Sequence, residues 1–144
     1  IKVYQKTEGM AEEYSEFYEL ADNIYIKLGD KDWAKKLFKK AEDKAEDCSD
    51  FLGLAECICE KVGDKGWAKK VYGKAESLAE DSGDYCELAA SLCKNLGDEE
   101  WTIRLYKIAE GKAEENYELR WLAESLAEKL GDKEWAGKIY KKAH

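Results

Sequence analysis

A seven-residue motif recurs along the chain at a fixed interval, and this interval limits the folds that the chain can adopt. The segment 28–34 (LGDKDWA) returns in three similar copies, each beginning 34 residues after the one before it. Recurrence at intervals of about 20 to 50 residues is typical of repeat arrays rather than of single globular cores. The tryptophans of the motif, which we expect to be core residues, are Trp33, Trp67, Trp101 and Trp135.

Each interval predicts a pair of helices. The first helix has apolar residues at the spacing i, i+3, i+4, i+7, which places them on one helical face. In the Gly-Asp pair that follows, we expect the glycine to end this helix in a left-handed conformation and the aspartate to cap the second helix. We expect Ser15, Ser49 and Asn116 to cap the first helices. The apolar face of the first copy consists of Phe17, Leu20, Ala21 and Ile24.

The repeat resembles the tetratricopeptide repeat (TPR) family, which is also built from 34-residue pairs of antiparallel helices. The first-helix pattern of that family, W-x-x-L-G-x-x-Y, has its counterpart here in residues 51–58, FLGLAECI. Further matches are a turn glycine, an alanine, an aromatic residue and a second alanine, here Gly63, Ala68, Tyr72 and Ala75.

Three departures from the family concern lengths and composition. The first helix is longer by one residue, the turn between repeats is shorter by one, and the chain contains no proline. The resemblance implies an all-α, right-handed α-solenoid of stacked antiparallel hairpins, with about nine helices. We expect residues 1–144 to form one array, with a half-repeat at 1–14, full repeats at 15–48, 49–82 and 83–116, and a truncated repeat at 117–144.

Composition excludes several functions. The chain of 144 residues has 32 acidic and 24 basic side chains, a net charge of −8, which argues against nucleic-acid binding. The second helices carry a column of basic residues at the repeat interval. We interpret this column as a solvated face, and RNA binding is the weaker alternative. No segment is apolar enough to span a membrane. The single histidine is His144 and has no matched nucleophile. We therefore expect no enzyme, no cofactor and no metal site. The basic column is Lys36, Lys70, Arg104 and Lys138.

The five cysteines indicate a reducing compartment. Their number is odd and their spacing matches neither a disulfide framework nor a zinc site. We expect reduced, mostly buried thiols. Together with the absence of a visible signal peptide, this predicts a cytoplasmic protein.

The first helices of TPR arrays line a concave groove, so the resemblance implies a non-catalytic scaffold that binds a peptide or helix. The acidic and apolar lining expected here favours a basic or amphipathic protein segment. A register shifted by one residue would instead line the groove with Glu19, Asn23, Glu87, Ser91, Trp121 and Ser125. The predicted partner-binding residues are Tyr18, Asp22, Tyr25, Leu52, Glu56, Cys59, Cys86, Cys93, Arg120, Trp121 and Glu124.

The alternative function is structural. The last helix repeats the apolar stripe of the internal copies, and an uncovered apolar face favours association. Copies of the chain could stack end to end into filaments or rings, forming a homo-oligomer. The residues predicted to make that contact are Val3, Tyr4, Trp135, Ile139 and Tyr140.

Overall fold

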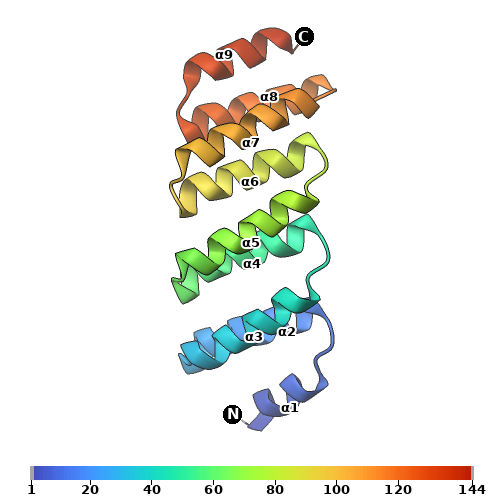
Figure 1. Ribbon diagram of the computed structural model, residues 1–144, viewed down its shortest axis with the longest axis vertical. Helices are drawn as coiled ribbons and strands as arrows, with labels where there is room; N and C mark the ends of the chain where they lie inside the picture. Colours follow the sequence, from blue (N-terminus) through green and yellow to red (C-terminus); the bar gives the residue numbers. More distant parts are fainter. Residues whose placement is uncertain (1, 144) are drawn as a thin grey trace. The chain divides into compact units, whose positions relative to one another are not determined.

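The computed structural model describes residues 2–143, and every regular element in that range is helical (Figure 1). Within these residues, nine α-helices and three single π-helical turns follow one another, and successive helices pack as hairpins, so the predicted all-α class is confirmed. Ile1 and His144, the ends of the predicted array, lie outside the described residues. The elements are α1 (Lys2–Met10), α2 (Tyr14–Asn23), η1 (Ile24–Leu28), α3 (Lys31–Lys44), α4 (Cys48–Cys57), η2 (Ile58–Val62), α5 (Lys65–Leu78), α6 (Ser82–Asn95), α7 (Glu99–Lys112), α8 (Asn116–Ser125), η3 (Leu126–Leu130) and α9 (Lys133–Lys142).

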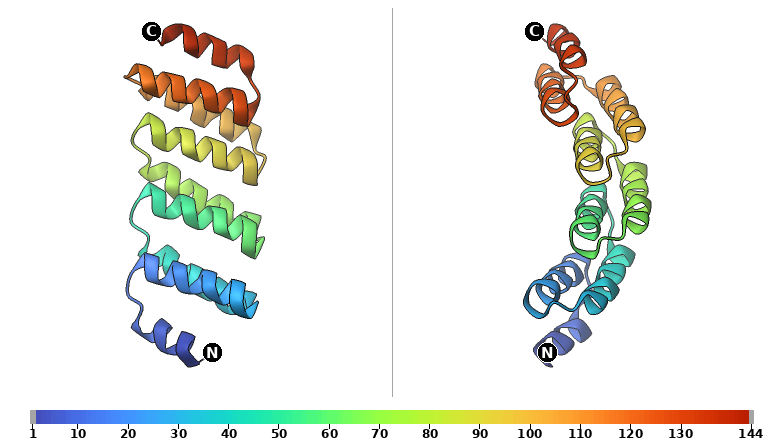
Figure 2. Two further views of the ribbon diagram at one scale, coloured as in Figure 1. Left: turned by 180° about the vertical axis from the view of Figure 1, so that it is seen from behind. Right: turned by 90° about the vertical axis from the view of Figure 1, so that its left-hand side faces the viewer.

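The chain divides into two compact units, residues 1–71 and 72–144, with the boundary inside α5. In the first unit α2 packs against α3, and α1 and α4 also contact this hairpin. In the second unit α6 packs against α7 and α8 against α9, while α6 and α8 touch each other (Figure 2). The predicted repeat boundaries stay a prediction.

The 34-residue interval governs where the helices begin. The first-type helices α2, α4, α6 and α8 begin at residues 14, 48, 82 and 116, and the second-type helices α3, α5, α7 and α9 begin at residues 31, 65, 99 and 133. Successive starts within each type are therefore 34 residues apart. Equivalent sequence positions consequently occupy equivalent places on their helices.

The Gly-Asp pair makes the predicted junction in all four copies. Its glycines have φ values between 65° and 77°, in the left-handed region that favours glycine. The aspartate that follows accepts a hydrogen bond from the backbone N–H of the motif tryptophan, at 2.9–3.1 Å. The glycines are Gly29, Gly63, Gly97 and Gly131.

The predicted caps of the first-type helices are wrong by one or two residues. Ser15, Ser49 and Asn116 lie inside the helices, and acidic residues take the cap positions instead. Asp47, for example, accepts from the backbone N–H of Asp50 at 2.8 Å. A carboxylate there also opposes the positive end of the helix dipole, which serine cannot do. The caps are Glu13, Asp47, Asp81 and Glu115.

A π-helical turn takes up the additional residue of the first-type helix. Three of the four first-type helices end in such a turn, η1, η2 and η3. At η2, the backbone N–H of Gly63 donates to the carbonyl of Ile58, five residues earlier, at 2.7 Å. The helix can thus be one residue longer than the TPR pattern and still end at the glycine.

The core consists of the predicted apolar columns. On the second-type helices, large aromatic side chains and alanines are fully buried at the same interval. The small alanines let neighbouring helices approach closely, and the aromatic rings fill the space beside them. The fully buried members are Phe38, Tyr72, Tyr106, Ala41, Ala75 and Ala109.

The motif tryptophans are half-buried, not core residues as predicted, because each uses its indole N–H in a polar contact. Trp101 Nε1 donates to Glu76 Oε1 at 2.9 Å, joining α7 to the end of α5. The same bond joins α3 to α1, α5 to α3 and α9 to α7, at 2.9–3.1 Å and always across 25 residues. The other pairs are Trp33–Glu8, Trp67–Glu42 and Trp135–Glu110. We call the four pairs the Trp–Glu clamp.

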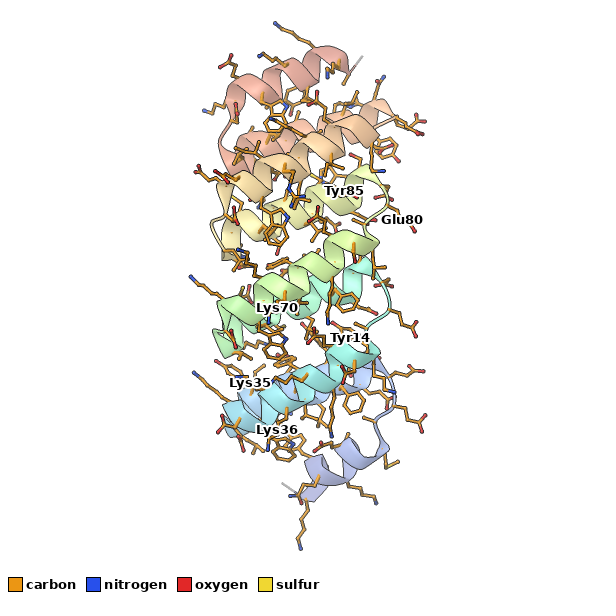
Figure 3. All side chains as sticks on the ribbon, in the orientation of Figure 1. Tyr14, Lys35, Lys36, Lys70, Glu80 and Tyr85 are labelled. Atoms are coloured by element: carbon orange, nitrogen blue, oxygen red, sulfur yellow. The ribbon has the colours of Figure 1, made fainter. Side chains whose placement is uncertain are left out.

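Basic side chains also bind glutamates of the clamp. Lys40 binds Glu8, Lys142 binds Glu110, and Arg104 reaches Glu76 at 3.1 Å. The hydrogen bond from Lys40 is the main cause of a lowered pKa at Glu8. Arg104 belongs to the predicted basic column, so part of that column is neutralised within the chain; Lys36 and Lys70 of the column are exposed on α3 and α5 (Figure 3).

Within the described part of the chain, each helix is too short or too polar to cross a bilayer.

We predict that the Trp–Glu clamp contributes measurably to stability. Glu76→Ala removes the acceptor of the Trp101 indole and the partner of Arg104, and should lower the free energy of unfolding by about 1–3 kcal/mol. A double-mutant cycle with Trp101→Phe, followed by urea denaturation, should give a coupling of about 1 kcal/mol. Glu80→Ala, at an exposed turn residue (Figure 3), is the control and should cost less than about 0.5 kcal/mol. Equal losses in both variants would contradict the prediction.

Candidate functional site

Two tyrosines of α2 close the space between α2 and α4 in the first unit. Tyr14 Oη donates to the backbone carbonyl of Asp50 at 2.8 Å, and Tyr18 Oη lies 2.6 Å from Cys57 Sγ (Tyr14 is labelled in Figure 3). The Tyr18 ring packs edge-on against Phe38, with 5.9 Å between ring centroids. The side chains of Tyr14 and Tyr18 therefore fill the space between α2 and α4.

Further along α2, an ion pair joins this helix to η2, which continues α4. Asp22 of α2 pairs with Lys61 of η2. Burial lowers the pKa of Lys61, since desolvation disfavours the ammonium form. Asp22, predicted to face a partner, thus contacts the neighbouring first-type helix instead.

The second unit carries small side chains at the equivalent places. A position in the first unit has its equivalent 68 residues later, two intervals of 34 along the sequence. In this register the large or charged residues of α2 and η1 are replaced on α6 by residues with short side chains. Tyr14, Tyr18, Asp22 and Tyr25 correspond to Ser82, Cys86, Ala90 and Cys93.

A hollow of about 170 Å³ lies between α6 and the α8–η3 segment. Cys86 and Ala90 line it from α6, and Trp121 and Ser125 line it from α8. Cys86 and Ser125 are the equivalents of Tyr18 and Cys57, the pair in contact in the first unit. The hollow therefore lies where the first unit holds the Tyr18 ring. We call it the α6/α8 hollow.

Trp121 forms an exposed aromatic wall of the α6/α8 hollow. Its side chain is 45% exposed, and its six-membered ring lies against Gly83, where an added Cβ would be 3.2 Å from Cζ3. The equivalent of Trp121 in the first unit is Gly53, which lies beside the Tyr14 hydroxyl. The large aromatic residue is thus Tyr14 of α2 in the first unit and Trp121 of α8 in the second unit.

Three glutamates and one lysine form the rim of the hollow. Glu87 comes from α6, Glu124 from α8, and Glu128 and Lys129 from η3. The pKa of Glu87 is raised, first because of partial burial and then because of repulsion from Asp84 and Asp81. The rim therefore has a net negative charge and favours a cation.

The polar groups at the floor of the hollow, Tyr106, Ser125 and Cys86, include two whose pKa values are raised. Tyr106 Oη lies 2.7 Å from Ser125 Oγ, and burial raises the pKa of Tyr106 to about 12. Burial also raises the pKa of Cys86, against the opposing effect of a hydrogen bond with Ser125. A neutral buried thiol is not an activated nucleophile.

The hollow combines residues from both predicted registers. Cys86, Trp121 and Glu124 were among the predicted partner-binding residues, whereas Glu87 and Ser125 belong to the shifted register. Each helix contributes residues of both registers: Cys86 and Glu87 come from α6, and Glu124 and Ser125 come from α8. The signal that would have located the hollow is a difference between equivalent positions of the two units. The clearest difference is Tyr18 in the first unit and Cys86 in the second.

The other predicted partner-binding residues lie elsewhere. Leu52 is buried in the core. Cys93 lies outside the lining, with its thiol 3.5 Å from the carbonyl of Lys129, and Arg120 is exposed on α8. The half-buried residues of the first unit are Tyr25 on η1, Glu56 on α4 and Cys59 on η2, away from the α6/α8 hollow in sequence. The predicted free cysteines are present, with Cys48, Cys57 and Cys86 buried and Cys59 and Cys93 half-buried.

The residues predicted for end-to-end contact have mixed environments. Tyr4 packs edge-on against Trp33, Trp135 packs against Tyr106 and binds Glu110, and Ile139 is buried. Val3 and Tyr140 remain exposed. End-to-end stacking stays a prediction.

Among residues 2–143, no group of three or more His, Cys, Asp or Glu side chains is placed to hold a metal ion. A larger hollow of about 460 Å³ lies beside the turns that precede α2 and α4, and charged side chains dominate its lining, among them Glu12, Lys44 and Glu46. Two acids near the second turn serve the backbone: Asp47 caps α4, and Asp50 of the lining accepts a hydrogen bond from the backbone N–H of Glu46 at 3.1 Å.

Comparison of the chain with protein-family models, with curated proteins and with solved structures finds no match.

We predict that the buried hydroxyl pair beneath the hollow is coupled. Tyr106→Phe removes one of the two side-chain hydrogen-bond partners of Ser125, the other being Cys86, and should cost about 1–2 kcal/mol of stability. In the first unit the equivalents are Phe38 and Cys57, so adding Ser125→Cys should recover part of the loss, because a thiol tolerates an apolar site. Thermal unfolding of the two single variants and the double variant measures the effect. Strictly additive losses would show that the two side chains are independent.

Proposed function

We propose that the chain is a non-catalytic binding protein that holds a basic segment of another protein on the α6–α8 face of its second unit. The α6/α8 hollow, with its exposed indole and acidic rim, is the observation that carries this proposal. Carboxylates around a small hollow attract lysine or arginine side chains, and the indole adds a favourable site for a cation. The net charge of −8 favours encounter with basic partners over the whole surface.

The resemblance to TPR arrays supports the same surface, since their first helices line the binding groove. Catalysis has little support, because the acidic side chains recur with the repeat and Cys86 is held neutral. Cytoplasmic location remains part of the proposal, because the five cysteines, all among the described residues, form no disulfide bonds.

A charge-reversal experiment tests the proposal. The probe is a capped, fluorescein-labelled pentapeptide with four lysines around a central phenylalanine, and its control has glutamates in place of the lysines. We expect Glu128→Lys to weaken binding of the lysine peptide about threefold to tenfold at low salt, and added salt to weaken binding to the unaltered chain.

The first unit offers a matched control for this variant. Glu60 is the equivalent of Glu128 and is also exposed on its π-helical turn, so Glu60→Lys makes the same change in net charge away from the hollow. We expect Glu60→Lys to have a clearly smaller effect. Equal effects of the two variants, or equal binding of the lysine and glutamate peptides, would refute a specific basic site.

We also predict that binding weakens at acid pH because of Glu87. A bound lysine stabilises the carboxylate form, so binding releases protons, and affinity should fall as the pH drops from neutrality toward the ordinary glutamate pKa of 4.5. The fall should begin above the ordinary glutamate range because the pKa of Glu87 is already raised. Asp81, Asp84, Glu124, Glu128 and Lys129 also face this region, so Glu87→Gln should flatten the pH profile only in its upper part. A profile unchanged by Glu87→Gln would contradict the assignment.

A further inference from the structure

We infer that the α6/α8 hollow receives one aromatic side chain, phenylalanine or tyrosine, of the basic segment bound there. This inference rests on the proposed function and names the feature of the segment that the hollow recognises. Four observations support it, and each concerns described residues of the chain.

The first observation is the internal template. In the first unit, the Tyr18 ring occupies the equivalent place, packs edge-on against Phe38 and contacts Cys57 through its hydroxyl. In the second unit Cys86 replaces Tyr18, and the ring is missing. The neighbours that would surround such a ring persist as Tyr106 and Ser125. The fold therefore already shows which kind of side chain fits between two first-type helices.

The second observation is size. The hollow measures about 170 Å³, and a cavity of about 150 Å³ is known to hold one benzene ring. Small-molecule pockets are larger, about 300 Å³ and above. A hollow of this volume therefore suits one aromatic side chain better than a free metabolite.

The third observation is the position of Trp121. Its indole is 45% exposed on the wall of the hollow, and aromatic rings pair favourably edge-to-face or offset at centroid distances of about 4.5–7 Å. Gly83 lies directly under the indole. A larger residue at Gly83 would push the indole away from α6 and alter the wall.

The fourth observation is charge. Glu87, Glu124 and Glu128 surround the opening, so the residues that flank the inserted ring have carboxylates within reach. The expected occupant is thus an aromatic residue with lysine or arginine beside it, rather than an aromatic residue in an acidic or neutral context.

The experiment compares two labelled pentapeptides, each with four lysines, that differ only in a central phenylalanine or alanine. We expect the phenylalanine peptide to bind at least about tenfold more tightly by fluorescence anisotropy, because one ring leaves water. Cys86→Tyr should reduce this ratio to about one, since the new side chain occupies the hollow as Tyr18 does in the first unit. Thermal unfolding checks that the variant folds.

Trp121→Gly provides a second variant that does not depend on filling the hollow. It places on α8 the residue that α4 has at Gly53, removes the exposed wall, and should also reduce the ratio. Tyr117→Ala is the matched control, because Tyr117 is an exposed aromatic residue on the same helix, 62% exposed and outside the lining; the ratio should persist in this variant.

The outcomes separate the two levels of the proposal. Equal binding of the phenylalanine and alanine peptides, or a ratio that survives both Cys86→Tyr and Trp121→Gly, overturns the aromatic site and leaves the basic-segment function standing. If the lysine peptide with the central phenylalanine binds no better than its glutamate control, the proposed function and the aromatic site are overturned together.

Discussion

The hydrogen bond from an indole N–H to a glutamate 25 residues earlier holds the second-type helices in a constant register. It recurs at 2.9–3.1 Å from Glu8–Trp33 to Glu110–Trp135. A polar bond of this kind has a fixed direction and length, whereas apolar packing alone tolerates sliding. The repeated alanines and aromatic rings of α3, α5 and α7 can therefore meet in the same way and remain fully buried.

A constant register on the second-type helices leaves the first-type helices free to differ. Apolar stripe residues such as Leu54 and Leu88 are fully buried in both units, but the positions between neighbouring first-type helices have changed. Tyr18 closes this space in the first unit, and Cys86 leaves it open in the second. Because the clamp and the core fix the backbone, such exchanges alter the surface without altering the helix starts.

The sequence is sufficient to predict the helices, their interval and the Gly-Asp junctions, because these depend on local periodicity and backbone conformation. It fails where an outcome depends on which neighbour a side chain meets. The Trp–Glu clamp joins residues 25 apart, and no local pattern distinguishes its glutamates from solvated ones. The cap prediction fails for a related reason, since Ser49 and Asp47 are both acceptable caps and only the helix dipole favours the acid. The α6/α8 hollow exists because equivalent positions, Tyr18 and Cys86, carry different side chains in the two units. The periodic pattern shows only what the repeats share and does not reveal this difference.

The proposed binding site differs from its counterpart in the first unit by a smaller side chain, Cys86 in place of Tyr18, and not by an added group. Replacing a buried tyrosine by cysteine removes ring contacts and costs stability, as any large-to-small change does. Here the loss is smaller than in a closed core, because the hollow opens to solvent and Trp121 covers part of it, resting on Gly83. An array of equivalent hairpins is well suited to this, since the filled space between α2 and α4 contributes to the core while the α6/α8 hollow stays open. In the proposed complex, the segment supplies what the first unit already contains at the equivalent place, an aromatic ring between two helices.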